Sequence, residues 1–429
     1  MHSTSRRTFL GAAATTAGAM TLAACGAGSG GGGEIPEEIE TDLSAEISYS
    51  IWDPAQKPAM EKIVAAFNEE YPDIAVSISV TPFAQYFEKL QTQATGGDLP
   101  DVFWMNGPNV RLYAAEGKLQ DISEVPGLDT AKYPQAMNEL YTFEDSQFCV
   151  PKDFDTIGLW WNQDHFEKAG VAAPDENWTW EDYAQAARDI TAALGAEGIW
   201  GGANGIENQA YLYPLTFQAG GEIISEDGTT SGYDSAGAIE AFTFARSLIA
   251  DGALPSIQFT TENKPADLFN SGKAAMLWSG NWSAAVFKDS PVRDAIRTAP
   301  LPQGAETVNV IHGIGNAMAA EGSNKSAAAA FLAFLGSEKA NLIQAEEGAA
   351  NPAYEGTATA YVESLPEFDL QMFLDNAADA KPYPVSKNTA AWLSLEADYF
   401  PRILGGEIEV ETGLKELATA MNEALADEQ

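Results

Sequence analysis

The sequence has few of the residues that most often carry chemistry or bind polyanions. It contains two cysteines and three histidines, too few histidines for an ordinary zinc site. Basic residues are also scarce, since 23 lysines and arginines stand against 62 acidic residues, a formal net charge of −39. A chain this acidic is not expected to bind nucleic acid or anionic lipid.

Motifs of common enzymes are missing as well. The sequence has no GxSxG nucleophile elbow and no GxxxxGK[ST] loop for ATP. A GxGxxG match at residues 26–31 follows no strand and precedes no helix, so we interpret it as chance. Asp153 and Asp155 resemble a glycosidase pair, but residues two apart on a strand point the same way and do not flank a bond. We therefore expect neither an enzyme nor a cofactor, and keep a glycoside-processing enzyme as an alternative.

The N-terminus has the layout of a secretion signal. Arg6 and Arg7 precede a weakly apolar run, residues 9–24, that is too short to span a bilayer. "SRRTFL" resembles a twin-arginine export motif, and "LAAC" resembles the lipobox of bacterial lipoproteins, in which the cysteine carries lipid. We expect a signal peptide at 1–24 and, at 25–44, a lipid anchor on Cys25 with a glycine-rich linker.

This reading places the protein at the extracytoplasmic face of the cell membrane, attached through lipid only. Export by the general route and an ordinary cleaved signal with an incidental cysteine remain alternatives. If Cys25 is lipidated, Cys149 has no disulfide partner, and we interpret it as a small buried residue.

Residues 46–105 alternate between strand-like and helix-like patterns, in the order "EISYSIW", "PAMEKIVAAFNEEYP", "IAVSISV", "QYFEKLQTQATGG" and "PDVFWM". This β-α-β-α-β order predicts a parallel α/β sheet, whose ligands usually lie beyond the C-terminal strand ends. Aromatic and hydrogen-bonding residues follow those ends: Trp52, Asp53, Phe83, Gln85, Trp104 and Asn106. We therefore expect these side chains at a single edge of the sheet.

The chain is long enough for two domains. Roughly 390 residues follow the signal and linker, which exceeds one hydrophobic core. A second unit begins near "CVPKDFDTIGLWWNQDHFEKAG", and "TWED" predicts a helix with a capping box formed by Thr179 and Asp182. From residue 354 onward the chain looks entirely helical.

Several segments, in this order, resemble the extracellular solute-binding proteins of ABC importers, the family of sugar binders that includes maltose-binding protein. They are "FNEEYPDIAV", "QTQATGGDLPDVFWM", "GLWWNQDHFEKAG", "TWEDYAQAA", "FNSGKAAMLWSGNW" and "AAAAFLAFLGSEKA". The resemblance implies an α/β, two-lobed, periplasmic-binding-protein-like fold with a hinge and discontinuous lobes. Lobe 1 would comprise 45–150 with a return segment at about 297–350. Lobe 2 would comprise 151–296 with C-terminal helices at about 351–429.

A sugar offers hydroxyls at its rim and an apolar face, so its site needs aromatic surfaces with acceptors and donors beside them. The resemblance places ligand contacts at Trp52, Asp53, Trp104, Asp155, Tyr211, Trp282 and Trp392. With neighbours chosen for their chemistry, the candidate ligand-binding residues are Trp52, Asp53, Gln85, Trp104, Asn106, Asp153, Asp155, Tyr211, Asn281, Trp282, His312 and Trp392.

Structural roles remain open for many of these residues. Trp104, Trp282 and Trp392 could instead belong to the core, and Asn281 could cap a helix. The two aspartates could be loop acids or hinge caps. His312 could be a hydrogen-bonded buried residue rather than a ligand contact.

The resemblance implies a surface-anchored binding component that captures a neutral sugar or oligosaccharide between two lobes. It would act as a monomer and deliver the sugar to ABC permease subunits. "MNGPN" after Trp104 replaces a charged pair of maltose-binding protein, so maltose itself is not expected. Six arginines follow residue 24, and we expect only Arg402 among them to lie near a proposed site segment. Because phosphate groups are usually bound by arginine, this scarcity disfavours phosphorylated ligands. Alternatives are a binder of glycerol phosphate, polyamine or peptide.

Overall fold

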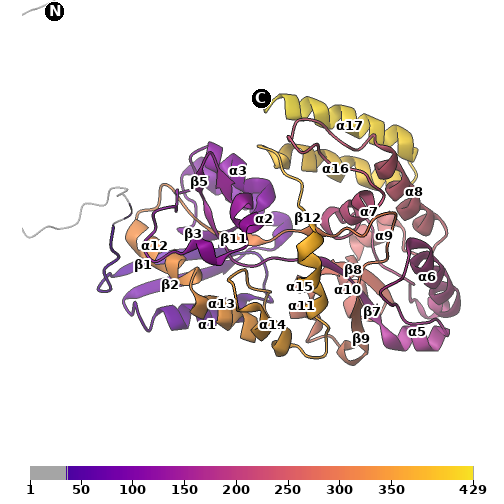
Figure 1. The fold of residues 1–429 in the computed structure, drawn as a ribbon, viewed down its shortest axis with the longest axis horizontal. Helices are drawn as coiled ribbons and strands as arrows, with labels where there is room; N and C mark the ends of the chain where they lie inside the picture. The colour runs from indigo at the N-terminus through magenta and orange to yellow at the C-terminus, as the bar shows by residue number, and fades with distance from the viewer. Residues whose placement is uncertain (1–34, 36, 429) are drawn as a thin grey trace, which may run out of the picture. The chain divides into compact units, whose positions relative to one another are not determined.

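Three parallel strands form one side of the first sheet, as the sequence predicts (Figure 1). The structure is a computed structural model, and it describes residue 35 and residues 37–428. β1 (Ala45–Ile51) pairs with β2 (Ile74–Val80) on one side and β3 (Val102–Asn106) on the other. All five residues of β3 are buried, which explains why its first four, "VFWM", form a continuous apolar run.

Two later strands complete this sheet in antiparallel orientation. β11 (Ile314–Met318) pairs with β3, and β6 (Cys149–Pro151) pairs with β11, giving the order β2-β1-β3-β11-β6. Cys149 is buried and free, as the sequence predicts for a small core residue. The helices and short strands around this sheet are α1 (Lys57–Phe67), α2 (Phe83–Gly96), α3 (Gly107–Ala115), α4 (Gln135–Leu140), β4 (Thr142–Phe143), β5 (Ser146–Gln147), α12 (Lys325–Leu335) and α13 (Glu338–Glu346).

A second, antiparallel sheet has the order β8-β7-β9. It contains β7 (Ile157–Asn162), β8 (Met276–Gly280) and β9 (Ile296–Ala299). The family resemblance implies that the chain returns to the first lobe near residue 297. Because β9 pairs with β7, the chain rejoins the first sheet only at β11.

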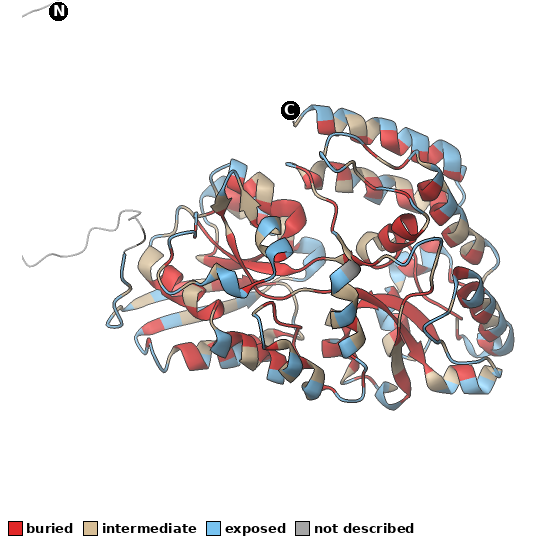
Figure 2. Cartoon of the chain, in the orientation of Figure 1, coloured by how far each residue is buried: buried red, intermediate tan, exposed pale blue. Residues whose placement is uncertain are grey.

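Helices lie around the second sheet, and each has a buried face and an exposed face (Figure 2). The predicted capping box is confirmed, since the Thr179 hydroxyl accepts from the Asp182 N–H and the Asp182 carboxylate accepts from the Thr179 N–H. The helices around the second sheet are α5 (Gln163–Ala169), α6 (Trp180–Leu194), η3 (Asn208–Leu212), α7 (Tyr213–Gln218), α8 (Ala236–Ala250), α9 (Ile257–Glu262), α10 (Pro265–Asn270), α11 (Ala284–Phe287), α14 (Ala358–Ser364), α15 (Gln371–Asp375), α16 (Thr389–Leu404) and α17 (Val410–Ala426).

The C-terminal part contains one exception to the all-helical prediction. A short strand, β12 (Lys381–Pro382), pairs in parallel with β10 (Val310–Ile311). Beyond it, α16 and α17 lie side by side, and both contact α8 (Figure 1).

Three crossover segments, residues 152–156, 309–313 and 349–353, connect the elements of one sheet to those of the other. Segment 152–156 lies between the other two. The Asp155 N–H donates to the His312 carbonyl at 2.8 Å, and the Phe154 N–H donates to the Asn351 carbonyl at 3.2 Å. The three segments therefore form one hydrogen-bonded layer.

A buried ammonium group marks the start of segment 152–156. Lys152 is 3% exposed, and its Nζ donates to Asp153 Oδ2 at 2.7 Å and to Gln56 Oε1 at 2.8 Å. The same Nζ lies 4.8 Å from the ring centroid of Trp104. The hydrogen bond to Gln56, which precedes α1, and the contact with Trp104 of β3 attach this crossover segment to both elements.

Removing this ammonium group is expected to destabilise the protein strongly. Lys152→Met leaves the buried Asp153 carboxylate without its cation, and breaking a buried pair from one side costs about 3–5 kcal/mol. Urea unfolding measures the loss. The matched control is Lys168→Met, which removes an exposed pair with Glu197 and should cost under about 1 kcal/mol. Equal losses in both variants would contradict the role given to Lys152.

Candidate functional site

Aromatic rings gather at the edge of the first sheet where β1 and β2 end. Trp52 follows β1, and Phe83 begins α2. The ring centroid of Trp52 lies 5.6 Å from that of Phe83 and 5.0 Å from that of Tyr86. Trp52 is half-buried and Phe83 is 57% exposed, so part of this aromatic surface faces outward. Phe83 stands at a predicted strand end but was not among the candidate ligand residues. Its position and ring type are the signal that could have added it.

Trp104 lies in the core instead of at this surface. Its side chain is fully buried, and its Nε1 donates to the Tyr49 hydroxyl at 2.6 Å. That hydroxyl donates in turn to Asn316 Oδ1 at 2.8 Å. Since Lys152 covers the indole face, the core alternative for Trp104 holds in this structure.

Two of the candidate acids are engaged by the protein itself. Asp53 is half-buried and accepts from the Ala55 N–H at 2.9 Å and from Gln56 Nε2 at 3.1 Å. Asp153 is buried and accepts from the Ile314 N–H at 2.8 Å and from Lys152. Asp153 is therefore a structural residue of the crossover, which was one of its two predicted roles.

Asp155 differs from its neighbour because it retains a free acceptor. Its Oδ1 accepts from Gln209 Nε2 at 2.7 Å. Within the described residues, neither Asp155 Oδ2 nor Gln209 Oε1 accepts a hydrogen bond, and Gln209 is only half-buried. Burial raises the pKa of Asp155 well above its usual value, and the charge of Asp153 adds to the rise. The Asp155–Gln209 pair thus presents two oxygen acceptors close together.

His312 and Asn106 hold the corner between β3 and α3. His312 Nε2 lies 3.3 Å from the Gly107 N–H and accepts from it, and its ring centroid is 4.8 Å from that of Tyr383. Burial lowers the pKa of His312 to about 3, so the ring is neutral at ordinary pH. Asn106 is buried and accepts from Asn109 Nδ2 at 2.7 Å. Both residues have the structural role that was left open for His312.

Asn281 and Trp282 follow the end of β8. Asn281 is 2% exposed and its Oδ1 accepts from the Thr156 N–H at 3.0 Å, so it fixes the crossover rather than capping a helix with its side chain. Trp282 is half-buried, and its indole covers Gly280 so closely that a Cβ there would lie 1.9 Å from it. The hydrogen bond from Thr156 to Asn281 thus attaches the end of β8, just before Trp282, to the crossover segment.

The remaining candidates do not form a site together. Tyr211 is fully buried, with its ring 5.3 Å from Trp278 in an edge-to-face contact. Trp392 is also fully buried, and its Nε1 donates to Ser386 Oγ at 2.9 Å. Gln85 is exposed in the first turn of α2. For Trp392 the core alternative therefore holds.

Sequence reasoning missed a buried acid on α16. Glu396 is 2% exposed and accepts from the Tyr213 hydroxyl at 2.8 Å, from the Tyr233 hydroxyl and from Asn208 Nδ2 at 3.1 Å. Burial raises its pKa to about 7, against the opposing effect of these hydrogen bonds. Glu396 lies four residues after Trp392 on the helix, so the helical period could have indicated its burial.

Two neighbouring side chains connect this acid to Asp155. Asn208 binds Glu396, and Gln209 binds Asp155. Both belong to η3, a π-helical turn, and such turns occur frequently at functional sites. η3 therefore joins the crossover to α16 through two hydrogen bonds.

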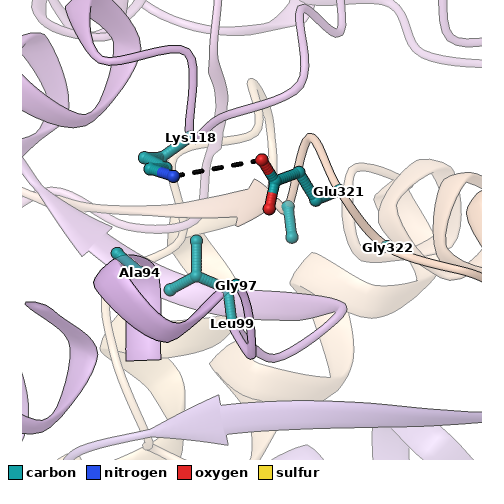
Figure 3. A pocket seen from close by; sticks show the side chains of 7 residues that line it. Ala94, Gly97, Leu99, Lys118, Glu321 and Gly322 are labelled. Atoms are coloured by element: carbon teal, nitrogen blue, oxygen red, sulfur yellow. Dashed lines mark ion pairs between the residues drawn. The ribbon is translucent and has the colours of Figure 1, made fainter. Parts of the chain in front are cut away.

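Two hollows elsewhere contain no predicted site residue. One, of about 20 Å³, lies beside Lys118 and Glu321, whose charged atoms are 3.9 Å apart (Figure 3). It has room for one or two water molecules at most, not a sugar. The other is an open depression of about 550 Å³ between β9 and the segment after α14. Within residues 37–428, no cluster of His, Cys, Asp or Glu is suited to a metal ion, and no helix is long and apolar enough to cross a membrane.

The expectation that only Arg402 lies near a site segment is wrong. Arg111 is on α3, five residues after Asn106 and directly beyond β3. It forms no ion pair within the described residues, and burial lowers its pKa. Because a half-buried guanidinium lies near the sheet edge, a ligand that carries an acidic group is an alternative to a neutral sugar.

Stability is expected to depend on the ionisation of Glu396. A pKa raised from 4.5 to about 7 contributes stability that is complete below pH 4.5 and is lost as the pH rises through 7. The rise of about 2.5 pKa units, at about 1.4 kcal/mol per unit, amounts to about 3.5 kcal/mol. Glu396→Gln, which stays neutral, should flatten the profile of unfolding free energy between pH 5 and 8.5. Glu407→Gln, on the exposed loop after α16, is the control, and parallel profiles for Glu396→Gln and the wild-type protein would rule the effect out.

Comparison with known proteins gives consistent similarities. Residues 52–342 match the sequence model of a family described as bacterial extracellular solute-binding protein. A putative binding protein of Brucella abortus is 25% identical over 369 residues, covering 84% of this chain and 88% of that protein. The galactooligosaccharide-binding protein of Bacillus subtilis is 24% identical over 352 residues, 79% of each chain. An ABC substrate-binding protein of Listeria monocytogenes, solved in complex with cycloalternan, superposes with a TM-score of 0.84 at 26% identity, covering 90% of this chain and all of that one.

Proposed function

The chain belongs to the family of bacterial extracellular solute-binding proteins, and on that premise we propose that it captures a sugar or oligosaccharide and delivers it to the membrane subunits of an ABC importer. The galactooligosaccharide binder and the cycloalternan complex support the choice of ligand class. Proteins of this family bind solutes for ABC transporters and are not enzymes. The proposed role is therefore capture and delivery, without chemistry on the sugar.

The observation that carries this proposal is the arrangement around crossover segment 152–156. Its first residue, Lys152, binds Gln56, which binds Asp53 beside Trp52. At its other end, Thr156 binds Asn281 beside Trp282. Four residue steps span at most about 14 Å, so the segment brings two half-buried indoles toward the same short stretch of chain. Asp155 lies within that stretch.

These groups match the surface of a sugar. Indole and phenyl faces cover its apolar face, and the oxygens of Asp155 and Gln209 accept from its hydroxyls. We propose Trp52, Phe83, Asp155, Gln209 and Trp282 as the ligand contacts. Asp53, Asn106, Asp153, Asn281 and His312 would support them through the hydrogen bonds described above.

We further propose that each sheet with its helices is one lobe. Lobe 1 would comprise 45–151 and a return segment starting near residue 312 instead of 297, and lobe 2 would comprise 152–299 with the C-terminal helices from 351. Contacts made by both lobes with one ligand favour a closed arrangement over an open one. The hinge would be the three crossover segments.

Calorimetry against a panel of sugars tests the function. We expect micromolar affinity, about 8 kcal/mol, for at least one of maltotetraose, galactotriose, raffinose and acarbose. Trp282→Ala should weaken binding about tenfold through lost stacking. Asp155→Asn should weaken it by about tenfold through the loss of one oxygen acceptor. The controls are Trp200→Phe and Asp164→Asn, which lie outside the proposed site.

Heat from none of these sugars, or unchanged affinity in both site variants, would contradict the proposal. A second candidate is a sugar with an acidic group, because Arg111 is half-buried without an ion-pair partner in the described part of the chain. Binding of trigalacturonate but of no neutral sugar, with loss in Arg111→Gln, would favour this candidate.

We also propose that the protein is a lipoprotein anchored through Cys25 after export by a twin-arginine signal. The signal, Cys25 and most of the linker lie outside the described residues, and the support is the sequence "SRRTFL" and "LAAC". In the bacterial host, the wild-type protein should incorporate labelled fatty acid and partition into detergent, whereas Cys25→Ala should do neither. The control is Cys149→Ala, and label retained by Cys25→Ala would contradict the anchor.

A further inference from the structure

We propose that sugar binding by this protein is coupled to uptake of a proton at Glu396, a positioning residue that acts through Asn208 and Gln209 of η3. The inference rests on the sugar site proposed above. It adds a dependence on pH that sugar capture alone does not require. Glu396 does not reach the ligand acceptors itself, since its carboxyl group is bound by Tyr213, Tyr233 and Asn208.

The carboxyl group lies inside a cage that offers hydrogen bonds but no positive charge. Tyr213 comes from α7 and Tyr233 from the segment before α8. Tyr383, after β12, receives a hydrogen bond from the same Asn208 Nδ2 at 3.3 Å and is edge-to-face with Tyr213. These three hydroxyls are the titratable groups that surround Glu396.

The cations on the surrounding helices are engaged with other acids. Arg246 of α8 pairs with Glu409, and Lys415 of α17 pairs with Glu411. Arg402, on α16 itself, pairs with Asp398 and Glu407. Arg111 of α3, which packs against α16, forms no ion pair with Glu396. An ionised Glu396 is therefore a buried charge without a countercharge in the described residues, which makes the neutral acid the favoured form in a dry environment.

The least buried side of this cage is the one formed by η3. Asn208 and Gln209 are half-buried, whereas Tyr213, Tyr233 and Glu396 are almost completely buried. A sugar seated on the Asp155–Gln209 pair covers η3 and removes water from this side, so the cost of ionising Glu396 rises further. By linkage, a ligand that favours the protonated form binds more tightly at lower pH and takes up a fraction of a proton near neutral pH.

Calorimetry with the tightest-binding sugar of the panel tests this coupling. At pH 7.5, titrations in phosphate and in Tris differ in ionisation heat, so the difference in measured enthalpy counts the protons taken up. We expect uptake of a fraction of a proton by the wild-type protein and an affinity at least about threefold higher at pH 6.0 than at pH 8.5. Glu396→Gln should show a smaller uptake and a flatter affinity profile. The pKa of Asp155 is also raised, so Asp155 can contribute to the proton uptake. The test is therefore the difference in proton uptake between the wild-type protein and Glu396→Gln.

Two further variants of this protein provide a second test of the coupling and a control. Tyr233→Phe removes a hydrogen bond that favours the ionised form, so the midpoint of the affinity profile should move to higher pH while binding persists. Glu407→Gln, at an exposed position, should behave as the wild-type protein. Identical proton uptake in wild-type and Glu396→Gln proteins, or an unmoved midpoint in Tyr233→Phe, would overturn the coupling and leave the sugar site standing. Absence of sugar binding at every pH would overturn both.

Discussion

The hydrogen-bonded layer of crossover segments is the constraint on which the rest of the structure depends. Three stretches of chain pass between the two sheets, and their polar groups are largely removed from water. Each buried group needs a partner, because an unpaired one costs far more than a hydrogen bond contributes. Lys152 donates hydrogen bonds to Asp153 and Gln56, and the Asn281 side chain accepts one from the Thr156 N–H. The layer thereby fixes the positions of the residues beside it.

The same constraint explains which groups remain available to a ligand. Where both oxygens of an acid are used within the layer, as in Asp153, the residue is structural. Asp155 is different because one oxygen stays free next to the free amide oxygen of Gln209. The neighbours of Trp52 and Trp282 in sequence, Asp53 and Asn281, are linked by hydrogen bonds to the two ends of the same crossover segment. A ligand that satisfies these acceptors and covers both indoles completes the hydrogen bonding that the chain leaves open.

Local patterns predicted much of the fold because they depend on neighbours in sequence. The β-α-β-α-β order and the capping box at Thr179 follow from periodicity and end signals alone. The pairing of β9 with β7 could not be predicted in this way, because the two strands are more than one hundred residues apart in the sequence. The site was harder to predict for the same reason. A position at a strand end does not tell whether a tryptophan turns outward, as Trp52 partly does, or into the core, as Trp104 does.

The crystal structure of the protein with its tightest-binding sugar tests this account most directly. The account predicts that the sugar hydroxyls lie within hydrogen-bond distance of the Asp155 carboxylate and the Gln209 amide. It also predicts that an apolar sugar face lies against Trp52 or Trp282, with contacts from both sheets' elements. A sugar bound away from segment 152–156, or held by one sheet and its helices alone, would contradict it.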